Sequence, residues 1–378
     1  MGITDRYAEQ LWLTLFAKAP EITLFDLRQI QQKIEARGRA PWQDQHPSFD
    51  FDQMMAVQPN GSTPAAPASV SRAAGYTFER VDAFLGKLGQ PIGLPSYKPF
   101  HSDGEDFVHT YLGMVGIPFE LTPRFPTEAN MVFLAESAAF DPGLVGKIKR
   151  QLLDGKSVVI TSGLLRALQG KGIEDIAEIR YTDRKIAVKE FGGRGGGGGT
   201  SAPAAASTQA AILIPELDYI TNDVWMRASG AAAGIPYPLL LEAGYAKGTL
   251  YVLTIPENFA DLYNLPTPVL TQLKSILCRD LFVQVEAPAQ VSLFAYDNGT
   301  FIVESFLPDP VDVRIVVNGH GNQLRDLQTN EVLAGQADAG GGRSGGDERR
   351  GMSPQGSARV NFLAQIKPHS FRVFQCEP

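Results

Sequence analysis

The clearest pattern of apolar and polar residues in the chain lies between residues 130 and 163. Two apolar runs, 131–135 and 158–160, flank an amphipathic segment with apolar residues at helical spacing, namely Leu144, Val145, Ile148, Leu152 and Leu153. Asp141 and Pro142 are typical of a helix start, and Gly155 is typical of a helix end. We therefore predict a βαβ unit, and with it a parallel sheet covered by helices.

The pattern changes after residue 281, where apolar and polar residues alternate in short runs. Asp297-Asn298-Gly299 is a strong hairpin-turn signal between two of these runs. Short strands at this spacing indicate an antiparallel β-sandwich. We therefore expect an α/β domain over residues 91–280 and a β-sandwich domain over residues 281–378.

The first 90 residues are harder to place. Residues 5–18 predict a helix with Trp12, Leu15 and Phe16 on its apolar side, and residues 21–27 predict a strand. A single strand cannot pair with itself. Either this strand joins a later sheet, or residues 1–57 are a helix–strand remnant of a barrel whose earlier part is absent. Residues 58–90 are expected to form a linker followed by a helix.

Two stretches of low complexity, 192–209 and 335–357, are expected to be disordered surface loops. The first contains a glycine run, but Thr200-Ser201-Ala202 follows it instead of the Lys-Ser/Thr of a phosphate-binding loop. We therefore interpret both stretches as linkers.

Composition excludes several classes of function. A net charge of −7 without a basic stripe argues against nucleic-acid binding, and the apolar runs are too short to span a membrane. There is no signal-peptide pattern, and two cysteines are too few for a disulfide framework or a cysteine zinc site. We expect a cytoplasmic protein with no cofactor and no bound metal.

The densest group of titratable side chains follows the predicted strand at 91–97 and consists of His101, Asp103, Glu105, Asp106 and His109. The end of a parallel strand is where open α/β sheets place ligands. On the predicted helix 105–115, Glu105 and His109 would have a spacing compatible with a metal. Capping by Asp103, with Glu105 and Asp106 at the positive helix start, explains the same residues without a ligand.

Two other stretches carry candidate chemistry. Asn222, Asp223 and Trp225 form a polar–aromatic patch in which Trp225 could stack on a sugar ring, although an interface or core tryptophan is the better explanation. Thr161-Ser162-Gly163 follows a predicted strand, where a nucleophile could lie. It lacks the Gly-x-Ser-x-Gly pattern, so we interpret it as a helix cap.

The order of these parts resembles the C-terminal part of barrel-type glycoside hydrolases, in particular bacterial β-galactosidases with a barrel, a trimerisation domain and a β domain. The resemblance covers roughly residues 91–378, and its motifs are YLGMVGIP at 111–118, FDPGLVGKIK at 140–149, GKSVVITSG at 155–163, GYAKGTLYVL at 244–253 and PHSFRVF at 368–374. It implies a flavodoxin-like fold for residues 91–280. That domain is also similar to class I glutamine amidotransferases, whose cysteine nucleophile has no counterpart here.

These hydrolases use two carboxylates on separate barrel strands. Residues 1–57 can supply at most one such strand, so the resemblance assigns no catalytic residue to this chain. It implies a non-catalytic accessory and oligomerisation portion, a homo-oligomer, and a carbohydrate ligand or a missing barrel domain as further partners. The alternatives are a free-standing hydrolase with a site at His101, Glu105 and Asp106, and a purely structural interaction module.

Overall fold

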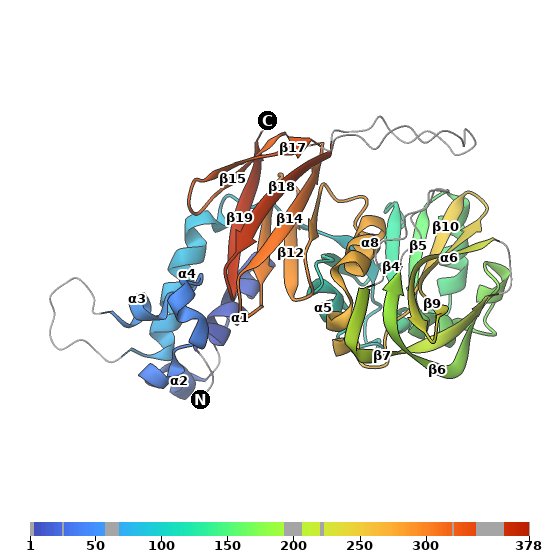
Figure 1. The fold of residues 1–378 in the computed structure, drawn as a ribbon, viewed down its shortest axis with the longest axis horizontal. Coiled ribbons are helices and arrows are strands. Elements are labelled where there is room, and N and C mark those ends of the chain that lie inside the picture. The colour runs from blue at the N-terminus through green and yellow to red at the C-terminus, as the bar shows by residue number, and fades with distance from the viewer. Residues whose placement is uncertain are drawn as a thin grey trace. The chain divides into compact units, whose positions relative to one another are not determined.

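The computed structural model describes residues 4–24, 26–56, 68–192, 206–219, 223–319, 321–337 and 359–377, which fall into two compact units (Figure 1). We name residues 93–292 the α/β unit. The β unit combines the residues up to 92 with 293–337 and 359–377. Within the described residues, no helix is long and apolar enough to cross a membrane.

The α/β unit is built on a nine-stranded sheet with the order β3-β2-β4-β5-β10-β9-β8-β6-β7. Its first five strands run parallel and are β2 (Leu94–Tyr97), β3 (Phe119–Thr122), β4 (Met131–Leu134), β5 (Ser157–Thr161) and β10 (Gly248–Leu253). The other four pair antiparallel and are β6 (Ile179–Gly192), β7 (Ala206–Tyr219), β8 (Val224–Ala232) and β9 (Ile235–Tyr245). The sheet is therefore mixed, with a parallel half and an antiparallel half.

Four helices accompany this sheet, namely α5 (Val108–Gly113), α6 (Leu144–Leu153), α7 (Ser162–Leu168) and α8 (Thr267–Leu277), and the short strand β11 (Val283–Glu286) follows α8. The predicted βαβ unit is confirmed, because β4 and β5 pair in parallel on either side of α6. Leu144, Ile148 and Leu152 of α6 are buried in the same core as Val132 and Val158 of these strands. The apolar period of the sequence therefore marked the buried face at these three positions, whereas Val145 is partly buried and Leu153 is 55% exposed.

Several predicted elements of the α/β unit differ from the structure. The helix expected at 105–115 begins only at Val108, because Glu105 and Phe107 have the positive φ angles of +49° and +71°. Residues 179–192 form one long strand, β6, which is irregular between Tyr181 and Lys185. Residues 206–209, expected in a disordered loop, belong to β7, and most of both low-complexity stretches lies outside the described residues.

The β unit contains the antiparallel strands expected for the C-terminal part of the chain. One sheet contains β1 (Pro91–Ile92), β12 (Val291–Tyr296), β13 (Thr300–Ser305), β19 (Ser370–Glu377), β15 (Gln323–Asp326) and β16 (Val332–Ala334). Another contains β14 (Val311–Asn318), β18 (Arg359–Ile366) and β17 (Gln336–Ala337). The pairings β1–β12, β13–β19, β15–β19, β15–β16, β14–β18 and β17–β18 are antiparallel.

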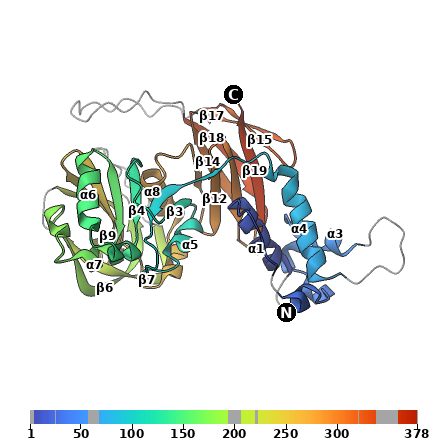
Figure 2. The same ribbon diagram turned by 180° about the vertical axis from the view of Figure 1, so that it is seen from behind.

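Helices from the first 85 residues complete the β unit, and they are α1 (Thr4–Phe16), α2 (Leu27–Ile30), α3 (Phe51–Met55) and α4 (Val70–Leu85), with 3₁₀ turns at Ala36–Gly38 and Pro41–Gln45. Helices α1 and α4 lie side by side (Figures 1 and 2). Trp12 and Phe16 of α1 are buried against Phe371 of β19. Helix α1 is therefore part of the core of the β unit.

The strand predicted at 21–27 does not form. Its described residues 21–24 belong to no helix or strand, and Asp26 accepts a hydrogen bond from the Arg28 N–H at the start of α2. The alternation of apolar residues is strand-like, but a strand also needs a neighbouring backbone to pair with.

Candidate functional site

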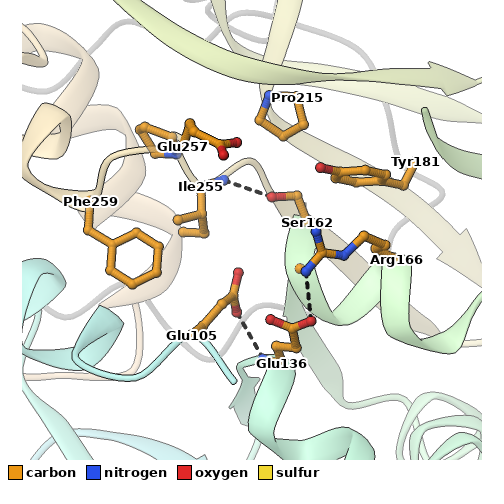
Figure 3. Close-up of a pocket in the computed structure, with 11 residues that line it drawn as sticks. Glu105, Glu136, Ser162, Arg166, Tyr181, Pro215, Ile255, Glu257 and Phe259 are labelled. Carbon is orange, nitrogen blue, oxygen red and sulfur yellow. Dashed lines mark hydrogen bonds and ion pairs between the residues drawn. The ribbon is translucent and has the colours of Figure 1, made fainter. Parts of the chain in front are cut away.

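A pocket of about 180 Å³ opens in the α/β unit where strands β4, β5 and β10 end (Figure 3). Segments far apart in the sequence contribute its lining residues, which are Glu105, Glu136, Ser162, Gly163, Arg166, Tyr181, Pro215, Ile255, Pro256, Glu257 and Phe259. The carboxyl ends of parallel strands are where open α/β sheets bind ligands. This pocket is therefore the candidate site of the unit.

Glu105 reaches the pocket from a contorted loop. Its carboxylate accepts hydrogen bonds from the Glu136 N–H at 2.9 Å and the Thr161 hydroxyl at 2.5 Å. Burial raises the pKa of Glu105, although these hydrogen bonds oppose the shift. A Cβ atom on Gly163 would lie 2.3 Å from Glu105 Oε1, so the close approach of this carboxylate requires glycine there.

Two ion pairs hold the other carboxylates of the pocket. Glu136 accepts a hydrogen bond of 2.8 Å from Arg166, whose guanidinium lies 5.5 Å from the ring centre of Tyr181. The bond to Glu136 raises the pKa of Arg166, so this residue stays charged. Glu257 pairs with Lys185 at 2.8 Å. Each of the two carboxylates therefore has its own cation.

The turn at Thr161-Ser162-Gly163 caps a helix, as predicted. The Thr161 hydroxyl accepts the Leu164 N–H at 3.1 Å and so begins α7. The Ser162 side chain points towards the strand end at Ile255, whose N–H it accepts at 3.0 Å (Figure 3). Ser162 is only 2% exposed, so its hydroxyl is held as a structural group and does not face solvent as a nucleophile would.

The structure separates the residues of the predicted titratable cluster. Of these residues, Glu105 is the one that lines the pocket. His101 and Asp103 are exposed loop residues, and Asp106 forms an ion pair with Lys98 at 3.0 Å. Asp103 does not cap a helix, because α5 starts five residues later, and Phe107 occupies its N-cap position.

His109 does not share a site with Glu105 either. Its Nε2 atom lies 2.8 Å from the Ser96 hydroxyl, and its ring packs against Phe119 and Phe133. Burial lowers the pKa of His109 to about 4, so the ring is neutral at physiological pH. The metal-compatible spacing of Glu105 and His109 required both residues to lie on one helix. Helix α5 begins at Val108 and does not include Glu105.

The second predicted patch does not line the pocket. Asn222 lies outside the described residues, Asp223 is an exposed turn residue, and Trp225 lies on β8 with 41% of its surface exposed. Sequence reasoning missed Glu136, Arg166 and Glu257. Glu136 and Glu257 each follow the end of a predicted strand, so the rule that placed Glu105 could have found them.

The β unit contains a separate buried group of acidic residues. Asp5 accepts hydrogen bonds from Trp42 and Gln43 at 2.9 and 2.6 Å, Glu9 contacts His369 at 2.6 Å, and Glu304 accepts one from Trp12 at 2.7 Å. Burial raises the pKa of Asp5 and Glu304. Across the part of the chain that the structure describes, no His, Cys, Asp and Glu side chains are grouped so as to hold a metal ion.

Three family models match successive parts of the sequence. Residues 1–87 match the model of a probable glycosyl hydrolase catalytic domain, and residues 282–376 match that of a probable glycosyl hydrolase C-terminal domain. Residues 89–258 match the second domain of the uncharacterized protein SSO3021. Among curated proteins, no sequence matches this chain.

Solved structures with similar folds include a β-galactosidase from Bacillus circulans sp. alkalophilus, with 13% identity, a TM-score of 0.44, and coverage of 82% of this chain and 45% of that one. An α-L-fucosidase from Paenibacillus thiaminolyticus has 11% identity and a TM-score of 0.48, and the match covers 85% of this chain and 54% of the fucosidase chain. This chain therefore spans about half the length of these enzymes.

The predicted resemblance rests most firmly on the family models. Two of them, at the beginning and at the end of the sequence, describe domains of a probable glycosyl hydrolase. The mixed α/β fold with antiparallel sheets in its C-terminal part agrees with the fold class expected from that resemblance. The resemblance is thereby confirmed: residues 1–87 and 282–376 of this chain are similar to the domains of a probable glycosyl hydrolase.

Proposed function

We propose that this chain is a non-catalytic accessory part of a glycosyl hydrolase-like protein. The observation that carries the proposal is the burial of the carboxylates of Asp5 and Glu9, two residues in the segment that matches the catalytic-domain model. Both side chains are buried in the β unit, where Trp42, Gln43 and His369 contact them. Glycoside hydrolysis needs two carboxyl groups that flank an accessible bond.

We further propose that the α/β unit is flavodoxin-like. Numbered along the chain, its five parallel strands have the spatial order 2-1-3-4-5, which is the order of flavodoxin-like folds. The similarity to glutamine amidotransferases concerns only this fold. At the strand–helix turn where a nucleophile would lie, this chain has Ser162 and not a cysteine. The cytoplasmic location remains part of the proposal, supported by the two cysteines, which are not joined in a disulfide.

The accessory role includes assembly into a homo-oligomer through the α/β unit. Strand β3 lies at the edge of the nine-stranded sheet, and its Leu121 is 54% exposed. An edge strand with an exposed apolar side chain can pair with a second copy. Light scattering across micromolar concentrations is expected to give a mass above that of the 41.0 kDa monomer. A monomer throughout this range would contradict the proposal.

The second candidate function is a hydrolase that acts at the pocket. It is favoured by the contrast between Glu105, whose pKa burial raises, and Glu136, which forms an ion pair with Arg166. An acid and a carboxylate in different environments can divide the roles of general acid and base. Because His101 and Asp106 do not line the pocket, this candidate depends on Glu105 and Glu136.

The two functions are separated by assaying the purified chain on a panel of aryl-glycosides. The accessory role predicts no turnover above that of a buffer blank. Glu105→Gln and Glu136→Gln are assayed beside it, with Glu79→Gln, an exposed position on α4, as the matched control. Turnover that the first two substitutions abolish and the control retains would overturn the accessory role and support the hydrolase. Equal turnover in all four proteins would indicate a contaminating glycosidase.

A further inference from the structure

We propose that the pocket of the α/β unit binds a single uncharged sugar ring, held by Glu105, Glu136 and Arg166. This inference rests on the proposed accessory function, because it states what that accessory unit recognises.

The loop before α5 is shaped to bring Glu105 into the pocket. His101, Gly104, Glu105 and Phe107 all have positive φ angles, of +57°, +106°, +49° and +71°. Such angles are unfavourable for residues other than glycine, and they persist where the surroundings enforce them, often at ligand sites. Gly163 supplies the matching space on α7. Two segments 58 positions apart are therefore adjusted to one carboxyl group.

The charges of the pocket favour a neutral ligand. Glu136 is neutralised by Arg166, and Glu257 is neutralised by Lys185. The Glu105 carboxyl group is held by the Thr161 hydroxyl and the Glu136 N–H, and burial raises its pKa. A cation would find Glu136 and Glu257 already paired and Glu105 already hydrogen-bonded, and an anion would have to compete with Glu136 for Arg166. A ligand that both donates and accepts hydrogen bonds would satisfy all of them.

Sugar hydroxyls have this dual capacity. They can donate to the carboxylate oxygens of Glu136 and Glu257, and they can accept from the guanidinium of Arg166 or the hydroxyl of Tyr181. The rings of Phe259 and Tyr181 border opposite sides of the space in Figure 3 and offer apolar faces to the C–H groups of a sugar. The volume of about 180 Å³ is below the roughly 300–1,000 Å³ of pockets for drug-sized ligands, so one ring fits better than a chain.

The test is an equilibrium binding experiment on the full chain with methyl glycosides of galactose, glucose, mannose, fucose and xylose. Saturation-transfer NMR and calorimetry are expected to detect binding of at least one of them. The Glu136→Gln/Arg166→Gln double variant should bind it at least tenfold more weakly. The matched control is Lys149→Gln/Asp175→Asn, which removes an ion pair of the same 2.8 Å length outside the pocket. The control should bind as the unaltered chain does.

A second variant covers the case in which the first does not fold. Phe259→Leu removes an aromatic face without changing any charge, and it should weaken binding at least threefold with an unchanged unfolding midpoint. Glucosamine, which carries a charged amine, and methyl glucuronide, which carries a carboxylate, should each bind at least tenfold more weakly than the neutral sugar. Tighter binding of either charged sugar would overturn the assignment of a neutral ligand.

The failure of this inference is distinguishable from that of the accessory function. If no methyl glycoside binds at millimolar concentration, the sugar site is refuted, whereas the absence of aryl-glycoside turnover still supports the accessory role. If the pocket variants bind as well as the control variant, the site lies elsewhere and the inference is also wrong. Turnover together with binding that depends on Arg166 would uphold the site and refute the accessory role.

Discussion

At the scale of single residues, Gly163 and Glu105 are fitted to each other. A methyl group on Gly163 would lie 2.3 Å from the Glu105 carboxylate, which is held by Thr161 and the Glu136 N–H. The carboxylate could move away only by losing these bonds. The fit makes the two positions energetically dependent on each other.

Gly163→Ala is therefore expected to lower the free energy of unfolding by about 1–3 kcal/mol, the range for lost hydrogen bonds to a charged or buried group. In a Glu105→Ala background the same change should have almost no effect. Gly146→Ala, in α6 with no atom within 4 Å of the new methyl group, is the control and should stabilise by about 0.5–1 kcal/mol. Urea denaturation measures these three differences, and equal losses from Gly163→Ala in both backgrounds would contradict the fit.

Glu304 gives a residue-scale prediction for the β unit. It is fully buried, Trp12 donates a hydrogen bond to its Oε1 atom, and burial raises its pKa well above the ordinary value of 4.5. A raised pKa means that the folded protein keeps a proton that the unfolded chain loses. Stability is then full below pH 4.5 and decreases as the pH rises towards the folded pKa.

Glu304→Gln removes this titration. Urea unfolding at pH 5 and pH 8 should show a smaller decrease in stability for the variant than for the unaltered chain. Some decrease should remain, because the raised pKa of Asp5 acts in the same direction. Glu79→Gln, on the exposed side of α4, should keep the full decrease. A variant with an unchanged pH dependence would show that Glu304 is not protonated in the folded protein.

Sequence reasoning at this scale selected Glu105 but not its partners. The end of a predicted strand marked where a ligand group could lie, which was enough to single out the loop at 101–106. The partners come from other elements, since Glu136 follows β4 and Arg166 lies in α7. The order of the strands in the sheet decides which charged residues lie together. This order cannot be derived from a single sequence.

At the scale of elements, the contact of α1 with strand β19 organises the β unit. The Phe16 ring lies 5.0 Å from that of Phe371 and 5.4 Å from that of Phe294, while the Trp12 ring lies 5.1 Å from Phe371. Phe16 is fully buried. This helix is therefore held by tertiary packing and not by its own helical propensity.

Phe16→Ala is expected to destabilise the β unit by about 3–5 kcal/mol, as is typical of deleting a buried aromatic ring. Leu15→Ala, on the partly buried side of the same helix, should have a clearly smaller effect. Chemical denaturation followed by tryptophan fluorescence provides the measurement, because Trp12 lies in the same core. A loss below about 1 kcal/mol for Phe16→Ala would show that the helix is not held by this packing.

The same scale shows where prediction from sequence succeeded. The β4–α6–β5 unit was predictable because its strands are buried on both faces and its helix has a single apolar side. The prediction of a strand at 21–27 failed, because the described residues of this segment have no neighbouring strand to pair with. The start of α5 depended on the φ angles at Glu105 and Phe107, which contacts distant in sequence determine.

At the scale of the whole molecule, the β unit is assembled from three separate segments of the chain, whereas the described part of the α/β unit comes from one continuous region, 93–292. Contacts between distant residues form slowly, because a long loop must close before they contribute. Pulsed hydrogen exchange during refolding should therefore protect the amides of β5 and β10 before those of α1. Earlier or simultaneous protection of α1 would contradict this order.

The contact between Trp12 and Phe371 also has a consequence for biosynthesis. The ribosome delivers α1 first and β19 more than 350 residues later, which takes roughly 18–70 s at about 5–20 residues per second. During that interval the apolar side of α1 has no strand β19 to cover it, while the continuous region 93–292 has already been released. The nascent chain would then contain a folded α/β unit and a helix α1 with an exposed apolar side. A chaperone or a second nascent chain has access to Trp12 and Phe16 in this period.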